Sequence, residues 1–203
     1  MTSDPTADAS TRLLAAAASG DVTAVARALD DGAPIEARDH KDRTALLVAA
    51  TFDHVDVARL LVERGADPNA LDDRHDTPWL VTGVTGSVAM LEVLLPANPD
   101  MTIRNRYGGV SIIPASERCH VDYVRRVATT GIDVNHVNDL TWTALLEAVI
   151  LGDGSAVYAE IVSILLAAGA DPSIPDKDGV TALEHARASG YDDIVRLLST
   201  PTH

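Results

Sequence analysis

Apolar residues along this chain recur in short groups that suit one face of a helix. One group is a pair of adjacent aliphatic residues, seen at Leu60–Leu61, Val93–Leu94, Ile164–Leu165 and Leu197–Leu198. Another begins with threonine and continues through small and aliphatic residues, at Thr44, Thr77, Thr143 and Thr181. The paired residues are typical of the inner seam of an amphipathic helix, so both groups predict short helices.

The threonine pattern is periodic, and its period of about 33 residues lies in the range of helical repeat proteins. Thr77 follows Thr44 by one period, and further equal steps reach Val110 and then Thr143. A step back from Thr44 reaches Thr11. A glycine or asparagine follows each predicted second helix, where it can form a left-handed cap: these residues are Gly32, Gly65, Asn98, Gly131 and Gly169. Each unit therefore predicts two helices.

One interval departs from this period. Thr181 follows Thr143 by five positions more than one period, which indicates an insertion of five residues near Gly152–Val157. We expect the insertion to lengthen the turn between the two helices of the fifth unit. Pro114 in the fourth unit predicts that its first helix starts late or bends, because proline disfavours a helix interior.

The T-x-L-x-x-A core, the turns at Gly65-Ala-Asp-Pro-Asn and Gly169-Ala-Asp-Pro-Ser, and the period of the pattern resemble the ankyrin repeat. The resemblance covers about residues 10 to 200 and extends to compact bacterial ankyrin proteins. It implies an all-α ankyrin-repeat solenoid of about six helix-turn-helix units with finger loops, the first and last unit being caps. The predicted arrangement is a flexible tail at 1–9 and a repeat domain at 10–203, with units at about 10–38, 39–71, 72–104, 105–137, 138–175 and 176–200.

Composition and charge narrow the class of partner. The formal net charge is −14, from 30 acidic and 16 basic residues, and such a field repels nucleic acid and anionic lipid. No stretch approaches the roughly 18 apolar residues of a membrane span. Residues 1–10 lack the features of a secretory signal. The single cysteine, Cys119, is inconsistent with an intramolecular disulfide, so we expect a cytoplasmic protein.

Candidate catalytic and metal-binding residues are few. His54 and His120 follow the turn between helices in their units, where a donor can satisfy turn carbonyl groups. His40, His75 and His136 lie in three different predicted fingers and would have to converge to bind a metal. Cys119 replaces the usual turn glycine, and the sequence indicates no general base that would activate its thiol. The sequence therefore predicts no enzyme, no metal and no cofactor.

Glu147 is an unusual residue for its place in the pattern. Val48 and Val81 occupy the same position in earlier units, on the inner helix face, and His185 occupies it one unit later. A lone buried carboxylate is costly, so we expect a contact between Glu147 and His185. That pair would either fix the packing of repeats or have a pH-sensitive or ligand-contacting role.

The resemblance also implies that fingers and first helices form a concave surface that binds another protein. Aromatic, aliphatic and arginine side chains, the usual centre of such interfaces, gather in units four and five. The predicted partner-binding residues are Tyr107, Trp142, Arg106, Arg118, Leu140, Ile150, Leu151 and Phe52. We therefore expect a protein–protein interaction module, an adaptor or regulator, that is a monomer.

Three alternatives stay open at this point. Trp142 and Ile150 could instead cover the lengthened fifth turn, with Tyr107 stacked between fingers. The apolar patch could form a homodimer. A small-ligand- or metal-binding protein or enzyme could use the polar residues of units four and five, namely Tyr107, Glu117, Arg118, His136 and Glu147.

Overall fold

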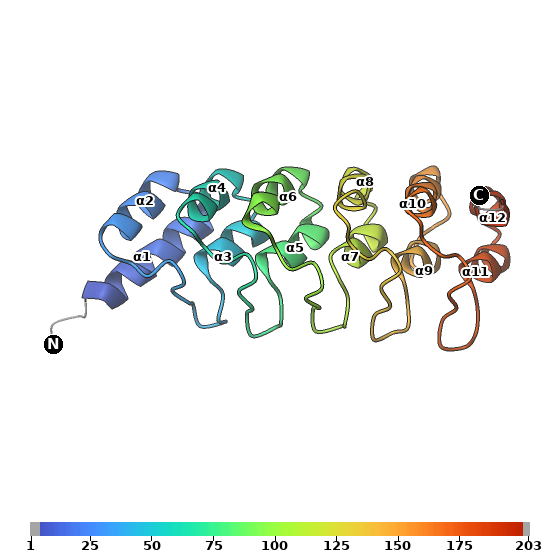
Figure 1. Ribbon diagram of the computed structural model, residues 1–203, viewed down its shortest axis with the longest axis horizontal. Coiled ribbons are helices and arrows are strands. Elements are labelled where there is room, and N and C mark those ends of the chain that lie inside the picture. The colour runs from blue at the N-terminus through green and yellow to red at the C-terminus, as the bar shows by residue number, and fades with distance from the viewer. Residues whose placement is uncertain (1–4, 201–203) are drawn as a thin grey trace. The chain divides into compact units, whose positions relative to one another are not determined.

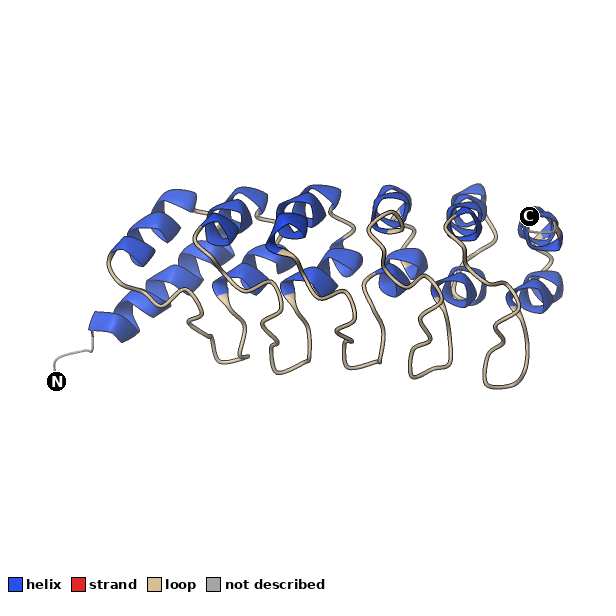
Figure 2. Cartoon of the chain, viewed as in Figure 1, coloured by secondary structure: helices blue, strands red, loops and turns tan. Residues whose placement is uncertain are grey.

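The computed structural model describes residues 5–200, which form helices joined by turns and contain no strand (Figures 1 and 2). An isolated bridge pairs Arg38 with Thr44. The chain divides into two compact units, the first ending at Asn105 and the second beginning at Arg106. This division lies within one residue of the predicted start of the fourth repeat. The all-α class predicted from the sequence is confirmed.

Unit 1 contains three helix pairs. They are α1 (Pro5–Ser19) with α2 (Val22–Asp30), α3 (Ala45–Thr51) with α4 (Val55–Glu63), and α5 (Pro78–Thr85) with α6 (Val88–Leu94), which continues into the 3₁₀ helix η1 (Leu95–Ala97). Helix α3 packs between α1 and α5, and α4 packs between α2 and α6. First helices thus stack on first helices and second helices on second helices.

Unit 2 repeats this plan. Its pairs are α7 (Ile112–Glu117) with α8 (Val121–Val127), α9 (Ala144–Ile150) with α10 (Ala156–Ala167), and α11 (Ala182–Ser189) with α12 (Asp192–Ser199). Helix α9 packs between α7 and α11, and α10 packs between α8 and α12. Within each unit, Figure 1 shows the long loops between pairs projecting to the same side.

The recurring threonine is the N-cap of a first helix. The Thr44 hydroxyl accepts a hydrogen bond from the backbone N–H of Leu47, and Thr143 does the same for Leu146, both at 3.2 Å. Thr77 and Thr181 cap α5 and α11 in the same way. Such a cap satisfies an N–H group that has no partner within the helix. The residues behind it are small or aliphatic because they are buried between neighbouring helices; all of 45–50 are buried in α3.

The start of α7 was expected from the sequence, whereas α1 starts earlier than expected. Helix α7 begins at Ile112, one residue later than its counterparts, as Pro114 predicts. Helix α1 begins at Pro5, so residues 5–9, assigned to a tail above, are helical, whereas residues 1–4 lie outside the described part. Ala9 is buried, and Asp8 in the first turn pairs with Arg12 at 3.2 Å. These contacts account for the earlier start.

Two of the five inserted residues lengthen the turn between α9 and α10, as predicted, whereas the other three lengthen α10, which has 12 residues against nine in α4. Two tyrosines pack against this turn. The Tyr191 hydroxyl donates to the carbonyl oxygen of Gly152 at 2.9 Å, and the Tyr158 hydroxyl donates to the carbonyl of Glu117 at 2.9 Å. Gly154 has φ +74°, and a Cβ there would lie 2.2 Å from Cδ1 of Tyr191. The lengthened turn is therefore fixed to both neighbouring repeats of unit 2.

Replacing Gly154 with alanine tests this packing. We expect Gly154→Ala to lower the free energy of unfolding by about 2–3 kcal/mol, because the new methyl group clashes with Tyr191 and the backbone is left-handed. Gly169→Ala is the matched control: its φ is +92°, but nothing lies within 4 Å of the added Cβ, so only the backbone cost of about 1 kcal/mol applies. Equal losses in urea denaturation would contradict the packing against Tyr191.

Candidate functional site

Each finger described here begins with an aspartate or asparagine. We call residues 39–43, 72–76, 105–109, 138–142 and 176–180 fingers two to six. In finger five, Oδ1 of Asn138 accepts hydrogen bonds from the N–H groups of Leu140 and Trp142, both at 3.0 Å. Asp39, Asp72 and Asp176 make the same two contacts in fingers two, three and six. The tip of each of these fingers is thereby held in one conformation.

Neighbouring fingers of one unit are also joined through their backbones. The N–H of Asp139 in finger five donates to the carbonyl oxygen of Tyr107 in finger four at 3.0 Å. In unit 1, Asp73 donates to Lys41 in the same way at 3.1 Å. The bond in unit 2 places Tyr107 of finger four beside finger five, which carries Leu140.

The predicted partner-binding residues of unit 2 lie at both ends of its first helices. At the finger end, Tyr107 is 55% and Leu140 53% exposed, and Trp142 is half-buried. The Arg106 guanidinium lies 4.5 Å from the centre of the Tyr107 ring, a cation–π contact. At the other end, Arg118 and Leu151 cap α7 and α9, and both are exposed, whereas Ile150 is half-buried.

The two ends are joined by the first helices of unit 2. Helix α9 has seven residues, so the finger end and the Leu151 end are separated by about 10 Å of helix. We call this set the unit 2 surface: Arg106, Tyr107, Arg118, Leu140, Trp142, Ile150 and Leu151. Phe52, the remaining predicted residue, lies in unit 1 at the C-terminus of α3 and is 52% exposed.

Glu147 is buried in α9, directly beside finger five. Its Oε1 accepts a hydrogen bond from Nδ2 of Asn138 at 2.9 Å. Burial, and after it the negative charge of Glu117, raises the pKa of this carboxyl from 4.5 to about 7, and the Asn138 hydrogen bond opposes both. Glu147 is thus a carboxyl that changes charge near neutral pH.

The predicted contact between Glu147 and His185 is wrong. His185 pairs instead with Asp176 of its own finger, with 2.8 Å between Nε2 and Oδ2. Glu147 follows Asn138 by nine residues, and His185 follows Asp176 by the same nine. Each helix residue is therefore satisfied by the first residue of its own finger, and this shared spacing is the signal that sequence reasoning missed.

Finger five also contains backbone strain that the sequence analysis did not anticipate. Thr141 has φ +64°, in the left-handed region, where fingers four and six have Gly108 and Gly179. A β-branched residue is rare in this region. The Thr141 hydroxyl is in addition buried without a hydrogen-bond partner. Both features cost free energy, and the contacts of Asn138 hold the finger in place despite them.

The remaining candidate residues have structural contacts. Nε2 of His54 lies 3.0 Å from the carbonyl oxygen of Ala18 in the preceding repeat, which confirms its predicted hydrogen-bonding role. Cys119 has φ +60°, matching a turn glycine such as Gly86 at +72°. Among residues 5–200, no group of three or more His, Cys, Asp or Glu side chains could hold a metal ion.

The polar residues of the alternative ligand-binding site are only partly brought together. Glu117 and Glu147 are close enough for their charges to interact. Nε2 of His136 is directed to the carbonyl oxygen of Gly108 at 2.6 Å, and Tyr107 contacts Arg106. This arrangement differs from a constellation whose members point at one reacting atom.

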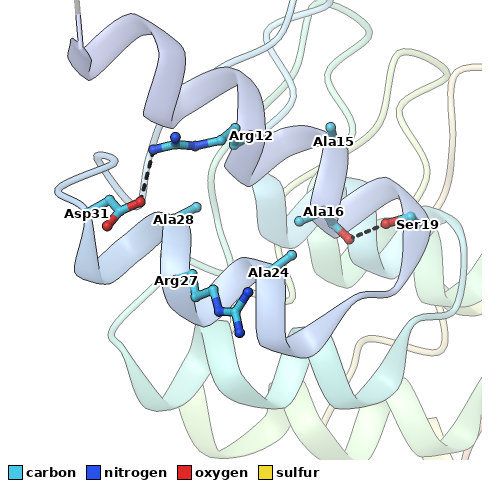
Figure 3. A pocket seen from close by; sticks show the side chains of 8 residues that line it. All are labelled: Arg12, Ala15, Ala16, Ser19, Ala24, Arg27, Ala28 and Asp31. Atoms are coloured by element: carbon cyan, nitrogen blue, oxygen red, sulfur yellow. Dashed lines mark hydrogen bonds and ion pairs between the residues drawn. The ribbon is translucent and has the colours of Figure 1, made fainter.

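A groove in unit 1 has a volume of about 450 Å³ and lies between α1 and α2 (Figure 3). Alanines line it, and Arg12 donates to Asp31 across it at 3.0 Å. The next repeat has Val57 and Leu61, both buried, at the positions that correspond to Ala24 and Ala28. Small side chains thus replace large apolar ones on the outer face of the first repeat, as a capping repeat requires.

Comparison with known proteins agrees with this repeat geometry. The family model described as ankyrin repeats (3 copies) matches residues 2–72 and 115–202, so the chain belongs to the ankyrin repeat family. It is 38% identical to the ankyrin repeat protein YahD of Escherichia coli (strain K12) over 186 residues, covering 91% of this chain and 92% of YahD.

Two solved structures are also similar. An ankyrin repeat domain from Acinetobacter baumannii AYE has a TM-score of 0.88 and 47% identity, covering 92% of this chain and 95% of that one. The ankyrin repeat protein EF0377 has a TM-score of 0.90 and 36% identity, covering 94% and 98%. Ankyrin repeats are in general protein–protein interaction modules rather than enzymes. Among residues 5–200, every helix is too short or too polar to span a membrane.

The buried carboxyl predicts a pH-dependent stability. Since folding raises the pKa of Glu147, its neutral form stabilises the fold fully below pH 4.5, and this stabilisation is lost as the pH rises through about 7. Relative to Glu147→Gln, the wild-type free energy of unfolding should fall by roughly 2 kcal/mol between pH 5 and pH 8. Urea denaturation at both pH values measures this difference. Parallel pH profiles for the two proteins would contradict the burial of an ionisable Glu147.

The strain at Thr141 predicts a stabilising substitution. Thr141→Gly should raise the free energy of unfolding by about 1 kcal/mol, because glycine adopts the left-handed backbone freely and removes the buried hydroxyl. Thr141→Val is the control, since it removes the hydroxyl but keeps the β-branch and should gain less. Thermal unfolding of the three proteins measures these gains. An equal gain in stability for the valine and the glycine variant would contradict backbone strain at Thr141.

Proposed function

We propose that this protein binds another protein through the unit 2 surface and acts as an adaptor or regulator. The observation that carries the proposal is the exposure of Tyr107, Leu140 and Leu151 on adjacent loops and helix ends of one unit. Membership of a family of protein-binding repeats supports it.

The chemistry of this surface suits a protein interface. Tyrosine, tryptophan and arginine supply most of the binding free energy at such interfaces, and Tyr107, Trp142 and Arg106 lie in adjacent fingers. The side-chain contacts of Asn138 and the bond from Asp139 to Tyr107 hold the backbone of these fingers before a partner arrives. A preformed loop loses less conformational entropy on binding than a mobile one.

We propose a cytoplasmic monomer whose concave face, made of fingers and first helices, receives the partner. The net charge of −14 supports a protein partner rather than nucleic acid or an anionic membrane. The single cysteine supports a reducing compartment.

A double substitution tests the surface. Tyr107→Ala combined with Trp142→Ala should abolish capture of the partner from native lysate, because each interface aromatic often contributes about 2 kcal/mol or more, roughly thirtyfold in affinity. The measurement is an affinity pull-down followed by mass spectrometry, with thermal unfolding of each variant to verify the fold.

Val157→Ala is the matched control for this experiment. Val157 is 43% exposed but lies on the second helix α10, outside the unit 2 surface. A protein retained by the wild type and by this control, but lost from the double mutant, is the expected result. A folded double mutant that retains the same proteins as the wild type would place the binding surface elsewhere.

A further inference from the structure

Glu147 lies beneath the part of the unit 2 surface that carries Leu140 and Trp142. Asn138 connects the two: its Oδ1 accepts the backbone N–H groups of Leu140 and Trp142 at 3.0 Å, and its Nδ2 donates to Oε1 of Glu147 at 2.9 Å. One side chain therefore joins the backbone of finger five to an ionisable group of α9. Beneath fingers two and three, the position of Glu147 is taken by Val48 of α3 and Val81 of α5, which carry no charge.

The conformation that this contact holds is strained. Thr141 has a left-handed backbone and a buried hydroxyl without a partner. Both costs are relieved if the finger moves away from α9 and its backbone and hydroxyl reach water. We call the position of finger five against α9 its closed position. Because of the two costs at Thr141, this position is less favourable in free energy than that of a finger with glycine at this place, such as finger six with Gly179.

Among the charged groups around Glu147, the carboxylate of Glu117 opposes its ionisation in the closed position. Glu117 at the end of α7 places a second negative charge near it. From α11, His185 is directed to Asp176 of finger six, and from α10, the Tyr158 hydroxyl is directed to the carbonyl of Glu117. In finger five itself Asp139 is exposed, and Arg118 is exposed at the end of α7. The Asn138 amide is the group that donates to the carboxyl.

We propose that the contact between Asn138 and Glu147 is a proton-dependent latch on finger five. The neutral carboxyl keeps the finger closed on α9, and ionisation of the carboxyl favours release of the finger. The physical reason is hydration: an ionised carboxylate gains more from water than a neutral carboxyl does, and the finger must open to admit that water. By linkage, a closed state that raises the pKa of Glu147 is disfavoured as the pH rises.

The consequence for binding rests on the proposed function. Release of finger five displaces Leu140 and Trp142 from their fixed positions, so a partner that binds the closed finger takes up a proton with it. Binding through the unit 2 surface should therefore weaken above neutral pH, whereas the fold of the unit persists.

Amide hydrogen exchange of the protein alone tests the latch. In ¹⁵N- and ¹³C-labelled wild-type protein, NMR follows the Glu147 carboxyl carbon and the exchange of the Leu140 and Trp142 amides from pH 6 to pH 8. We take the pKa of the carboxyl as about 7 when finger five is closed and as 4.5 when the carboxyl is hydrated. The equilibrium constant for opening of the finger should then increase about tenfold from pH 6 to pH 8, in addition to the intrinsic pH dependence of amide exchange. The midpoint in exchange should coincide with that of the carboxyl.

Finger two provides the control within the same molecule. Its Lys41 and Arg43 amides are held by Asp39 as finger five is held by Asn138, but the residue beneath is Val48, so only the intrinsic pH effect should appear. Glu147→Gln, which still accepts the Asn138 hydrogen bond, should remove the additional pH dependence of finger five.

Two results would overturn the latch. One is a carboxyl of Glu147 that titrates while finger five and finger two keep the same pH dependence. The other is an additional pH dependence of finger five that survives in Glu147→Gln. Neither result depends on a partner, so failure of the latch is distinct from failure of the proposed function, which the Tyr107 and Trp142 substitutions test.

Discussion

Stacking of one helix pair on the next is the interaction on which each unit depends. A first helix such as α3 buries every residue from Ala45 to Ala50, and its own second helix is too small to cover them alone. The neighbouring first helices α1 and α5 complete the cover. Because this face is used for packing, the exposed side chains of Tyr107, Leu140 and Leu151 lie in the fingers and at the helix ends.

The same stacking explains why most of the fold can be predicted from the sequence. The regular period, the capping threonines and the insertion after Ile150 are repeated or interrupted patterns, and each is set by local geometry that recurs in every repeat. Pro114 and the late start of α7 follow from the missing proline N–H. The exposed positions of Tyr107, Leu140 and Leu151 also follow from their place in the repeat.

The contacts that could not be predicted from the sequence depend on which of several neighbours a side chain contacts. Glu147 and His185 occupy equivalent positions in adjacent repeats, and proximity of repeats alone favoured a contact between them. The structure pairs each with its own finger, at Asn138 and Asp176, because a loop that folds back over its helix is nearer than the next helix. The left-handed backbone of Thr141 was likewise hidden, since threonine does not signal it as glycine does.

Site-specific photo-crosslinking in cells tests most directly whether the unit 2 surface contacts another protein. A photoreactive phenylalanine analogue placed at Tyr107 or Leu140 should form a covalent adduct with another polypeptide on irradiation, whereas the same analogue at the exposed Val157 should not. Adducts at Val157 alone, or none at Tyr107 and Leu140 in a folded protein, would contradict the account.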